Sequence, residues 1–146
     1  MPIKLLAVVF LFLSGVAASN VESFGQGLCI YEYFSQGTVT YYSELQGSAS
    51  DDLAMIKVCG ILAVIFSIII FLPLIAVRIK IIYAFMLILL LVAELIILNM
   101  IEAVPYKEVI YDSIVYCSNY AMIVWIICKI FFLISSGYYL FKYEEY

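Results

Sequence analysis

Histidine is absent from this chain of 146 residues. Its absence removes the commonest general base, the commonest metal ligand and the side chain that most often titrates near neutral pH. Charged residues make up only 12% of the sequence, and Lys and Arg together number seven, so no basic stretch suited to nucleic acid occurs. We therefore expect a protein that is not an enzyme, holds no metal or cofactor, and binds no nucleic acid.

Hydrophobic residues, by contrast, make up 67% of the chain, and most of them gather in four apolar stretches: 3–19, 53–77, 81–101 and 120–141. A helix needs roughly 20 mostly apolar residues to cross a bilayer. The last three stretches meet this length, and the first falls a little short of it. The sequence predicts the all-α membrane class: one domain, residues 1–146, folded as an antiparallel four-helix transmembrane bundle in a lipid bilayer, with outer loops at 20–52 and 102–119.

The first apolar stretch has two interpretations. It can be a retained span, as the four-helix architecture assumes. A single Lys4, an apolar core and the small residues Ala17, Ala18 and Ser19 also fit a secretory signal peptide. Cleavage there would leave three spans and would not change the orientation of the rest. The residues leave both interpretations open.

Basic residues predict the orientation in the membrane. Four of them flank the spans on one side: Lys4, Arg78, Lys80 and Lys142. Segment 20–52 has no Lys or Arg, and segment 102–119 has one lysine against three acidic residues. Positive charge beside the spans marks the cytoplasmic side. We therefore expect both termini in the cytoplasm and both longer loops outside, in the plasma membrane or an endomembrane.

The first outer loop has the composition of a small β-hairpin. Segments 28–34 and 38–45 are rich in β-branched and aromatic residues, and they flank the turn sequence Ser35-Gln36-Gly37. Four of its tyrosines are candidates for contact with a partner: Tyr31, Tyr33, Tyr41 and Tyr42. Tyrosine suits protein interfaces because it joins a large apolar ring to a polar tip. Packing of these rings onto the lipid headgroups is the alternative.

Two charges lie well inside the predicted bilayer, Glu94 in the third span and Lys129 near the centre of the fourth. A charge at the bilayer centre costs on the order of 3 kcal/mol or more, so we expect it to be paired. A Glu94–Lys129 ion pair is the simplest solution. The alternative is a pair of Glu94 with Lys57, about one turn into the second span, which would leave Lys129 for a partner protein.

The four cysteines divide by position. Cys59 and Cys128 lie within the second and fourth spans, where we expect them to pack as small apolar side chains. Cys29 in the first outer loop and Cys117 at the outer end of the fourth span share the oxidising side of the membrane. The sequence therefore predicts a Cys29–Cys117 disulfide that ties the hairpin to the bundle.

Small residues follow one face of each of the first two spans, at the spacings that let membrane helices approach closely. They are Ala7, Ser14 and Ala18 in the first span, and Gly60, Ala63 and Ser67 in the second. We expect these faces to lie inside the bundle. A homodimer face at Gly60 is the alternative.

The layout resembles that of the small tetraspan membrane proteins, with four spans, a longer first outer loop of β character and a tight basic turn between spans two and three. Glu94 is similar to the acid late in the third span of tetraspanins, and the hairpin before the second span is similar to that of claudins. The chain departs from both families. Gly27-Leu28 is followed by Cys29 where a claudin would show Gly-Leu-Trp, and segment 102–119 is far shorter than a tetraspanin's second loop. The resemblance implies a shared topology and carries over no functional residue.

Three functions are compatible with these features. The first is a non-enzymatic tetraspan protein that acts as a structural, adhesion or accessory subunit through lateral contacts with itself or other membrane proteins, and through its outer loop. The second is a channel or transporter subunit that uses Glu94 and Lys129. The third is a small subunit of a large membrane complex, in which Lys129 meets an acid of a partner.

Overall fold

The computed structural model describes residues 3–21, 28–32, 35–41, 48–71, 80–101 and 105–142, with the side chains of 48–53 left out. These residues are mostly helical. The elements in chain order are α1 (Ile3–Ser19), β1 (Cys29–Tyr31), β2 (Val39–Tyr41), α2 (Ser48–Phe71), α3 (Lys80–Leu98), α4 (Tyr106–Val115) and α5 (Tyr120–Lys142).

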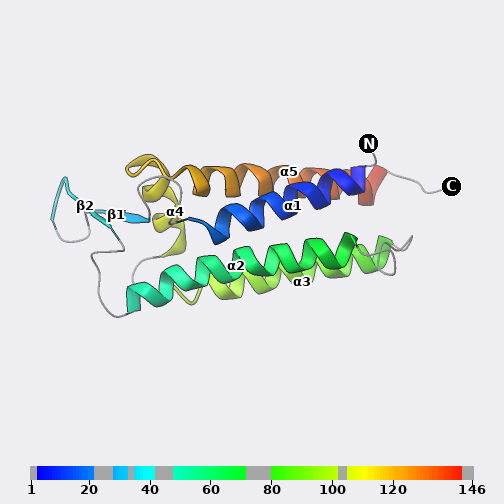
Figure 1. Cartoon of the computed structure of the whole chain (residues 1–146), viewed down its shortest axis with the longest axis horizontal. Coiled ribbons are helices and arrows are strands. Elements are labelled where there is room, and N and C mark those ends of the chain that lie inside the picture. The colour runs from blue at the N-terminus through cyan, green and yellow to red at the C-terminus, as the bar shows by residue number, and fades with distance from the viewer. Residues whose placement is uncertain are drawn as a thin grey trace.

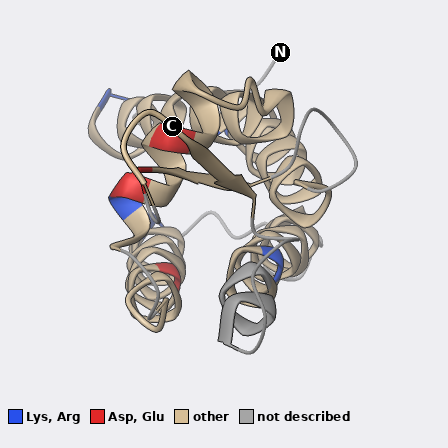
Figure 2. Ribbon diagram, turned by 90° about the vertical axis from the view of Figure 1, so that its left-hand side faces the viewer, with Lys and Arg blue, Asp and Glu red and all other residues tan. Residues whose placement is uncertain are grey.

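The four longer helices lie alongside one another, and each runs antiparallel to the next one in the chain (Figure 1). Helix α1 packs against both α2 and α5, and α2 also packs against α3. Strands β1 and β2 and helix α4 lie across one end of these helices, as the end-on view shows (Figure 2). We call that end the cap end. The terminal end is the opposite one, where α1 begins and α5 ends.

Three of the described helices are long and apolar enough to cross a membrane: residues 54–71 of α2, the whole of α3 and the whole of α5. Helix α1 is apolar but has only 17 residues, a shortfall that the sequence also indicated. A multi-pass membrane protein follows from these lengths, because water cannot solvate so much apolar helix surface.

The predicted boundaries need correction at α2 and at the end of α3, which stops at Leu98 instead of 101. Helix α2 begins at Ser48 instead of 53, so the first outer loop ends five residues earlier than predicted. The sequence carries Ser, Asp and Asp at positions 48, 51 and 52, residue types that are common in the first turn of a helix. Residues 72–77 of the predicted span and Arg78 lie outside the described residues.

Two clusters of buried side chains form the core, one in each half of the bundle. The cluster near the cap end joins all four long helices to the cap, and includes Ala18, Val21, Ile30, Ile56, Leu98, Met122 and Trp125. The cluster near the terminal end joins all four long helices, and includes Ala7, Leu11, Ala63, Leu90, Phe132 and Tyr139.

The sheet is the small antiparallel hairpin that the sequence predicts. Its register pairs Cys29 with Tyr41 and Tyr31 with Val39. Gly37 adopts a φ of 74°, in the left-handed region that glycine occupies without strain, as expected for the last turn residue. Residues 33–34 and 42–45 of the predicted strands, with Tyr33 and Tyr42, lie outside the described residues.

Helix α4 was not predicted, because segment 102–119 reads as a loop with several charged residues. Three apolar side chains spaced four residues apart, Tyr106, Ile110 and Ile114, pack against the core cluster of the cap end. Val109 is fully buried. This i, i+4 pattern is the helical signal, and Pro105 just before the helix supports it, since proline is tolerated where an N–H has no helical partner.

Candidate functional site

An ion pair between α3 and α5 is the first feature that could carry function. Lys129 Nζ donates to both carboxylate oxygens of Glu94, at 2.7 Å to Oε1 and 2.8 Å to Oε2. The side chain of Lys129 is 15% exposed and that of Glu94 is 7% exposed. The structure therefore places Lys129 as a partner of Glu94, as the simplest solution predicted.

The surroundings of this ion pair are mostly apolar. The ring of Phe132 lies one turn further along α5, with its centroid 6.0 Å from Lys129 Nζ. On the other side, the buried Cys59 thiol of α2 donates to the backbone oxygen of Glu94 at 3.9 Å. In apolar surroundings the two opposite charges attract each other strongly. Removing one of them would leave the other buried without a partner, which costs much free energy.

A second polar contact links the same two helices nearer the terminal end. The Tyr83 hydroxyl of α3 and Ser136 Oγ of α5 lie 2.7 Å apart, and both side chains are buried. The Tyr83 ring also meets Tyr139 edge to face, at 5.1 Å between centroids. Long polar and aromatic side chains thus connect α3 to α5 at two depths.

The small-residue faces lie inside the bundle, as predicted. Ala7, Ser14, Ala18, Gly60, Ala63 and Ser67 are all buried. A Cβ placed on Gly60 would come within 2.5 Å of the Ser19 nitrogen, so α1 and α2 meet backbone to backbone at this point. The alternative of a homodimer face at Gly60 is wrong, because α1 of the same chain already occupies that face.

Gly15 is the residue of α1 that meets Gly60 in this contact, and it was not predicted from the sequence. A Cβ on Gly15 would lie 2.7 Å from the Gly60 oxygen. Its signal was present beside Ser14, but glycine next to serine in a short apolar stretch also fits the signal-peptide interpretation. Ser14 and Ser67 donate back to their own helices, at 2.8 Å to Leu11 O and 2.6 Å to Val64 O.

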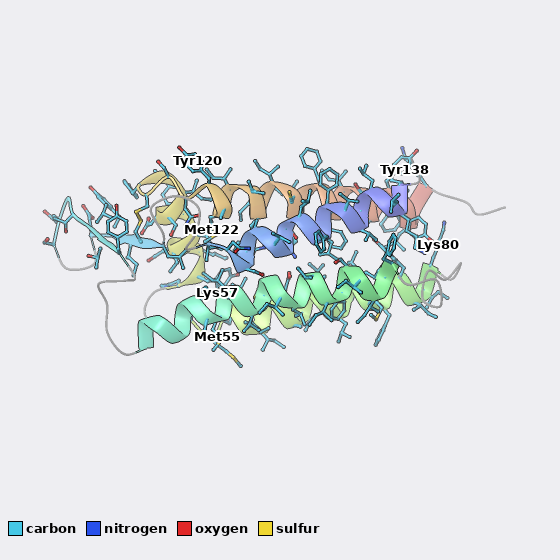
Figure 3. The ribbon with its side chains drawn as sticks, in the orientation of Figure 1. Met55, Lys57, Lys80, Tyr120, Met122 and Tyr138 are labelled. Atoms are coloured by element: carbon cyan, nitrogen blue, oxygen red, sulfur yellow. A yellow bond between two sulfur atoms is a disulfide. The ribbon has the colours of Figure 1, made fainter. Side chains whose placement is uncertain are left out.

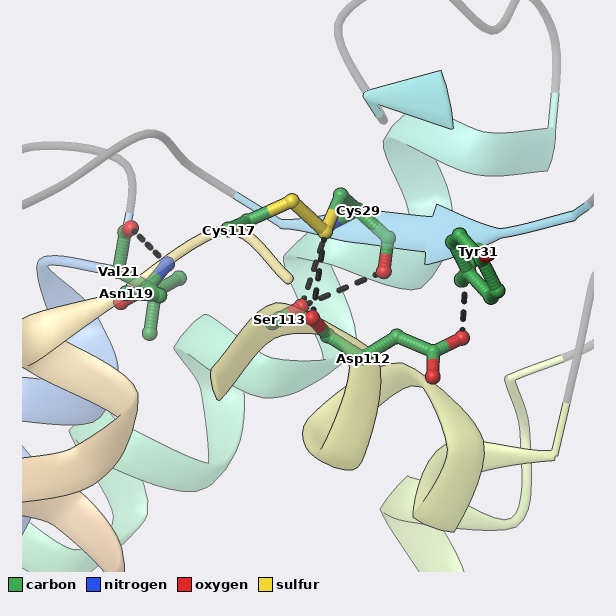
Figure 4. The surroundings of a disulfide bond; sticks show 7 residues. All are labelled: Val21, Cys29, Tyr31, Asp112, Ser113, Cys117 and Asn119. Atoms are coloured by element: carbon green, nitrogen blue, oxygen red, sulfur yellow. Dashed lines mark hydrogen bonds between the residues drawn. A yellow bond between two sulfur atoms is a disulfide. The ribbon is translucent and has the colours of Figure 1, made fainter. Parts of the chain in front are cut away.

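The cap forms the second candidate region, and a disulfide holds it together. Cys29 of β1 is bonded to Cys117, just after α4, with 6.4 Å between Cα atoms (Figure 4). The Cys29 N–H donates to Ser113 Oγ at 3.1 Å, and the Tyr31 N–H donates to Asp112 Oδ2 at 3.0 Å. The predicted disulfide is therefore confirmed, and α4 side chains satisfy the backbone of the strand beside it.

Asn119 fastens the cap to the helices and was not singled out in the sequence. Its Oδ1 accepts from the Met122 N–H at 3.0 Å, which makes it the N-cap of α5. Its Nδ2 donates to Val21 O at 3.0 Å, just beyond α1. Asparagine directly before an apolar run was the available signal for the cap. The link to α1 has no local signal.

The two described tyrosines of the hairpin, Tyr31 and Tyr41, are only partly exposed. Tyr31 is half-buried and stacks on Tyr116, with 4.0 Å between ring centroids and 9° between planes. Tyr41 is half-buried as well. The more exposed rings come from the second loop and the start of α5, with Tyr111 at 60% and Tyr120 at 65% exposure. Desolvation, followed by the neighbouring tyrosines and carboxylates, raises the pKa of Tyr116.

Two apolar grooves flank α1 on the outside of the bundle, each with a volume of about 280 Å³. The first lies between α1 and α5 and is lined by Leu13, Val16, Tyr120 and Val124, among others. The second lies between α1 and α2, nearer the terminal end, and is lined by Leu5, Val9, Phe12 and Phe71, among others. Grooves without polar lining suit lipid chains better than a polar substrate.

The described residues contain no group of three or more Cys, Asp or Glu side chains placed to hold a metal ion. Comparison of the chain with protein-family models, with curated proteins and with solved structures finds no match. The arguments about function therefore rest on the geometry above.

Proposed function

We propose that the chain is a non-enzymatic tetraspan membrane protein with both termini in the cytoplasm. It acts as a structural, adhesion or accessory subunit, through lateral contacts in the membrane and through its outer cap. The shared layout with small tetraspan proteins supports this topology. The proposed location is the plasma membrane or an endomembrane.

The packing of α1 supports its role as a fourth span. Ala7, Leu11 and Ala18 are fully buried, and α1 and α2 touch backbone to backbone where Gly15 meets Gly60. Cleavage of α1 as a signal peptide would uncover the middle of both α2 and α5. At 1.5 Å per residue its 17 residues cover about 26 Å, against roughly 30 Å for a bilayer core. Slight thinning of the bilayer accommodates that difference.

The observation that carries the proposal is the pairing of polar side chains inside the described helices. Glu94 binds Lys129, Tyr83 binds Ser136, and Ser14 and Ser67 bind their own backbones. These pairs satisfy several of the polar groups that a transport path would need. Large apolar side chains instead cover the outward faces, most completely on α3, the least buried of the three long helices. Lateral contact is the use that such a surface supports.

A channel or transporter subunit is the second candidate, and the Glu94–Lys129 pair is the observation that favours it. Charged pairs within the membrane often lie on ion or proton pathways. A subunit of a large complex, with Lys129 bound to a partner's acid, is the third candidate. The two hydrogen bonds from Lys129 to Glu94 speak against it, because they already occupy the lysine.

The topology can be tested by cysteine accessibility in cells. Gln36→Cys lies in the exposed hairpin turn and Ile79→Cys directly precedes α3, and each is made in a Cys59→Ala, Cys128→Ala background. A membrane-impermeant maleimide should label position 36 from outside the cell, and position 79 only after permeabilisation. The opposite pattern would refute the proposed orientation.

The function can be tested by lateral crosslinking together with ion flux. In the same background, Ile88→Cys on the outward face of α3 should crosslink to a second copy or another membrane protein in native membranes. Leu90→Cys, fully buried on the same helix, is the matched control and should not. Reconstituted vesicles should show no ion flux above protein-free vesicles. A flux that Glu94→Gln abolishes, without any crosslink from position 88, would establish the channel alternative instead.

A further inference from the structure

Lysines from three different helices gather at the terminal end of the bundle. Lys4 lies in the first turn of α1, Lys80 begins α3, and Lys142 ends α5. Figure 3 labels Lys80 at this end, with Tyr138 of α5 at the same level. The described first turns of α1 and α3 and last turns of α2 and α5 contain no acidic residue. This end of the bundle therefore presents positive charge only, among the residues described.

Two of these lysines converge on one buried ring. Lys4 Nζ lies 5.8 Å, and Lys80 Nζ 6.0 Å, from the centroid of the Tyr139 ring. The two ammonium groups therefore cannot be farther apart than the sum of those distances. Tyr139 itself is buried, so its ring is held in place. Each cation is attracted to the ring face.

Lys142 has a different environment. Its Nζ lies 5.6 Å from the centroid of Tyr138, whose ring is exposed on the outer surface of α5. Lys142 thus lies at the same end of the bundle as the other two lysines and carries the same charge, but it contacts Tyr138 instead of Tyr139.

We propose that Lys4, Lys80 and the ring of Tyr139 form a site for the phosphate headgroup of an anionic phospholipid. Basic pockets between transmembrane helices at the membrane surface bind such headgroups. The site requires only that both ammonium groups lie beside the same ring, whatever else they contact. It rests on the proposed membrane-spanning arrangement, and it does not depend on which face is cytoplasmic.

An apolar groove beside the site provides room for the lipid chain. The groove between α1 and α2 begins at Leu5, next to Lys4, and continues past Val9 and Phe12 toward the middle of the bundle. The groove has a volume of about 280 Å³, and its lining is almost entirely apolar. A phospholipid with its phosphate at Lys4 can therefore place an acyl chain in this groove.

The test measures lipid binding to the full chain in phosphatidylcholine nanodiscs, titrated with a fluorescent phosphatidylinositol bisphosphate. Lys4→Gln and Lys80→Gln should each weaken binding about fivefold and Lys142→Gln by less than about twofold, since each lysine at the headgroup contributes about 1 kcal/mol and 1.4 kcal/mol is tenfold. The double variant Lys4→Arg, Lys80→Arg keeps both charges and should bind like the wild type. If a glutamine variant folds poorly, the binding of this arginine variant is compared with that of the wild type instead.

Three results would overturn the proposal. Equal weakening by all three glutamine variants would mean that the overall surface charge attracts the lipid, without a site at Tyr139. Unchanged binding of the Lys4→Gln, Lys80→Gln double variant would mean that these lysines do not contact the headgroup. Displacement by inorganic phosphate at the concentration of the lipid would mean recognition of free phosphate. Because nanodiscs present the lipid on both faces, failure here is distinct from failure of the topology.

Discussion

Replacing Glu94 by Gln, or Lys129 by Met, should each lower the free energy of unfolding in detergent by about 3–5 kcal/mol, because each change leaves the other charge buried without its partner. The double variant should recover most of that loss, since an apolar or neutral pair of similar volume needs no compensating charge. Thermal or denaturant unfolding followed by circular dichroism measures all four proteins of the cycle.

Exposed side chains of the same types serve as controls for the ion pair. Glu108→Gln and Lys107→Met lie on the exposed face of α4, and they should change the stability by no more than about 0.5 kcal/mol. Single and double variants of equal stability would show that the Glu94–Lys129 contact contributes nothing. A role for Lys129 in binding a partner protein would then explain its position better than the ion pair.

Loss of the Cys29–Cys117 disulfide should destabilise the cap by about 2–5 kcal/mol, because the bond closes a loop of 88 residues and removes much of the freedom of the unfolded chain. Cys29→Ser, Cys117→Ser, or a reductant acting on the wild type, should give the same effect. Hydrogen exchange should increase in β1 and α4. The contact between α1 and α2 should persist, because no part of it involves the cap.

Two further proteins make the disulfide test specific. The Cys59→Ala, Cys128→Ala variant lacks the free thiols and should respond to reductant like the wild type. The Cys29→Ser, Cys117→Ser variant should not respond at all. A wild-type melting temperature that is the same with and without reductant would contradict the prediction.

Some of these features could be predicted from the sequence because they depend on position along the membrane normal. Run length predicted the spans, and the depths of Glu94 and Lys129 predicted their pairing. The shared oxidising side of Cys29 and Cys117 predicted the disulfide, although the short distance that such a bond needs could only come from the structure. The turn residue Gly37 indicated where the hairpin reverses.

Other features depend on how the helices are rotated and which ones are neighbours. The Gly15–Gly60 contact, the bond from Asn119 to Val21 and the convergence of Lys4 and Lys80 on Tyr139 belong to this group. In water, the alternation of apolar and polar residues reveals which face of a helix is buried. In a bilayer, lipid and helix interior are equally apolar, so these helices are apolar all round and their rotation leaves little trace in the pattern.

The sequence by itself therefore determined the membrane class, the approximate spans, the charge bias and the two side chains that most need a partner, because burial of charge and exposure to an oxidising face act on residue type and depth alone. Only the tertiary structure decided that α4 closes the cap, that α1 packs on α2 at Gly60, and that Lys4 and Lys80 lie beside the ring of Tyr139. These outcomes follow from close packing between segments far apart in the chain, which no local pattern specifies.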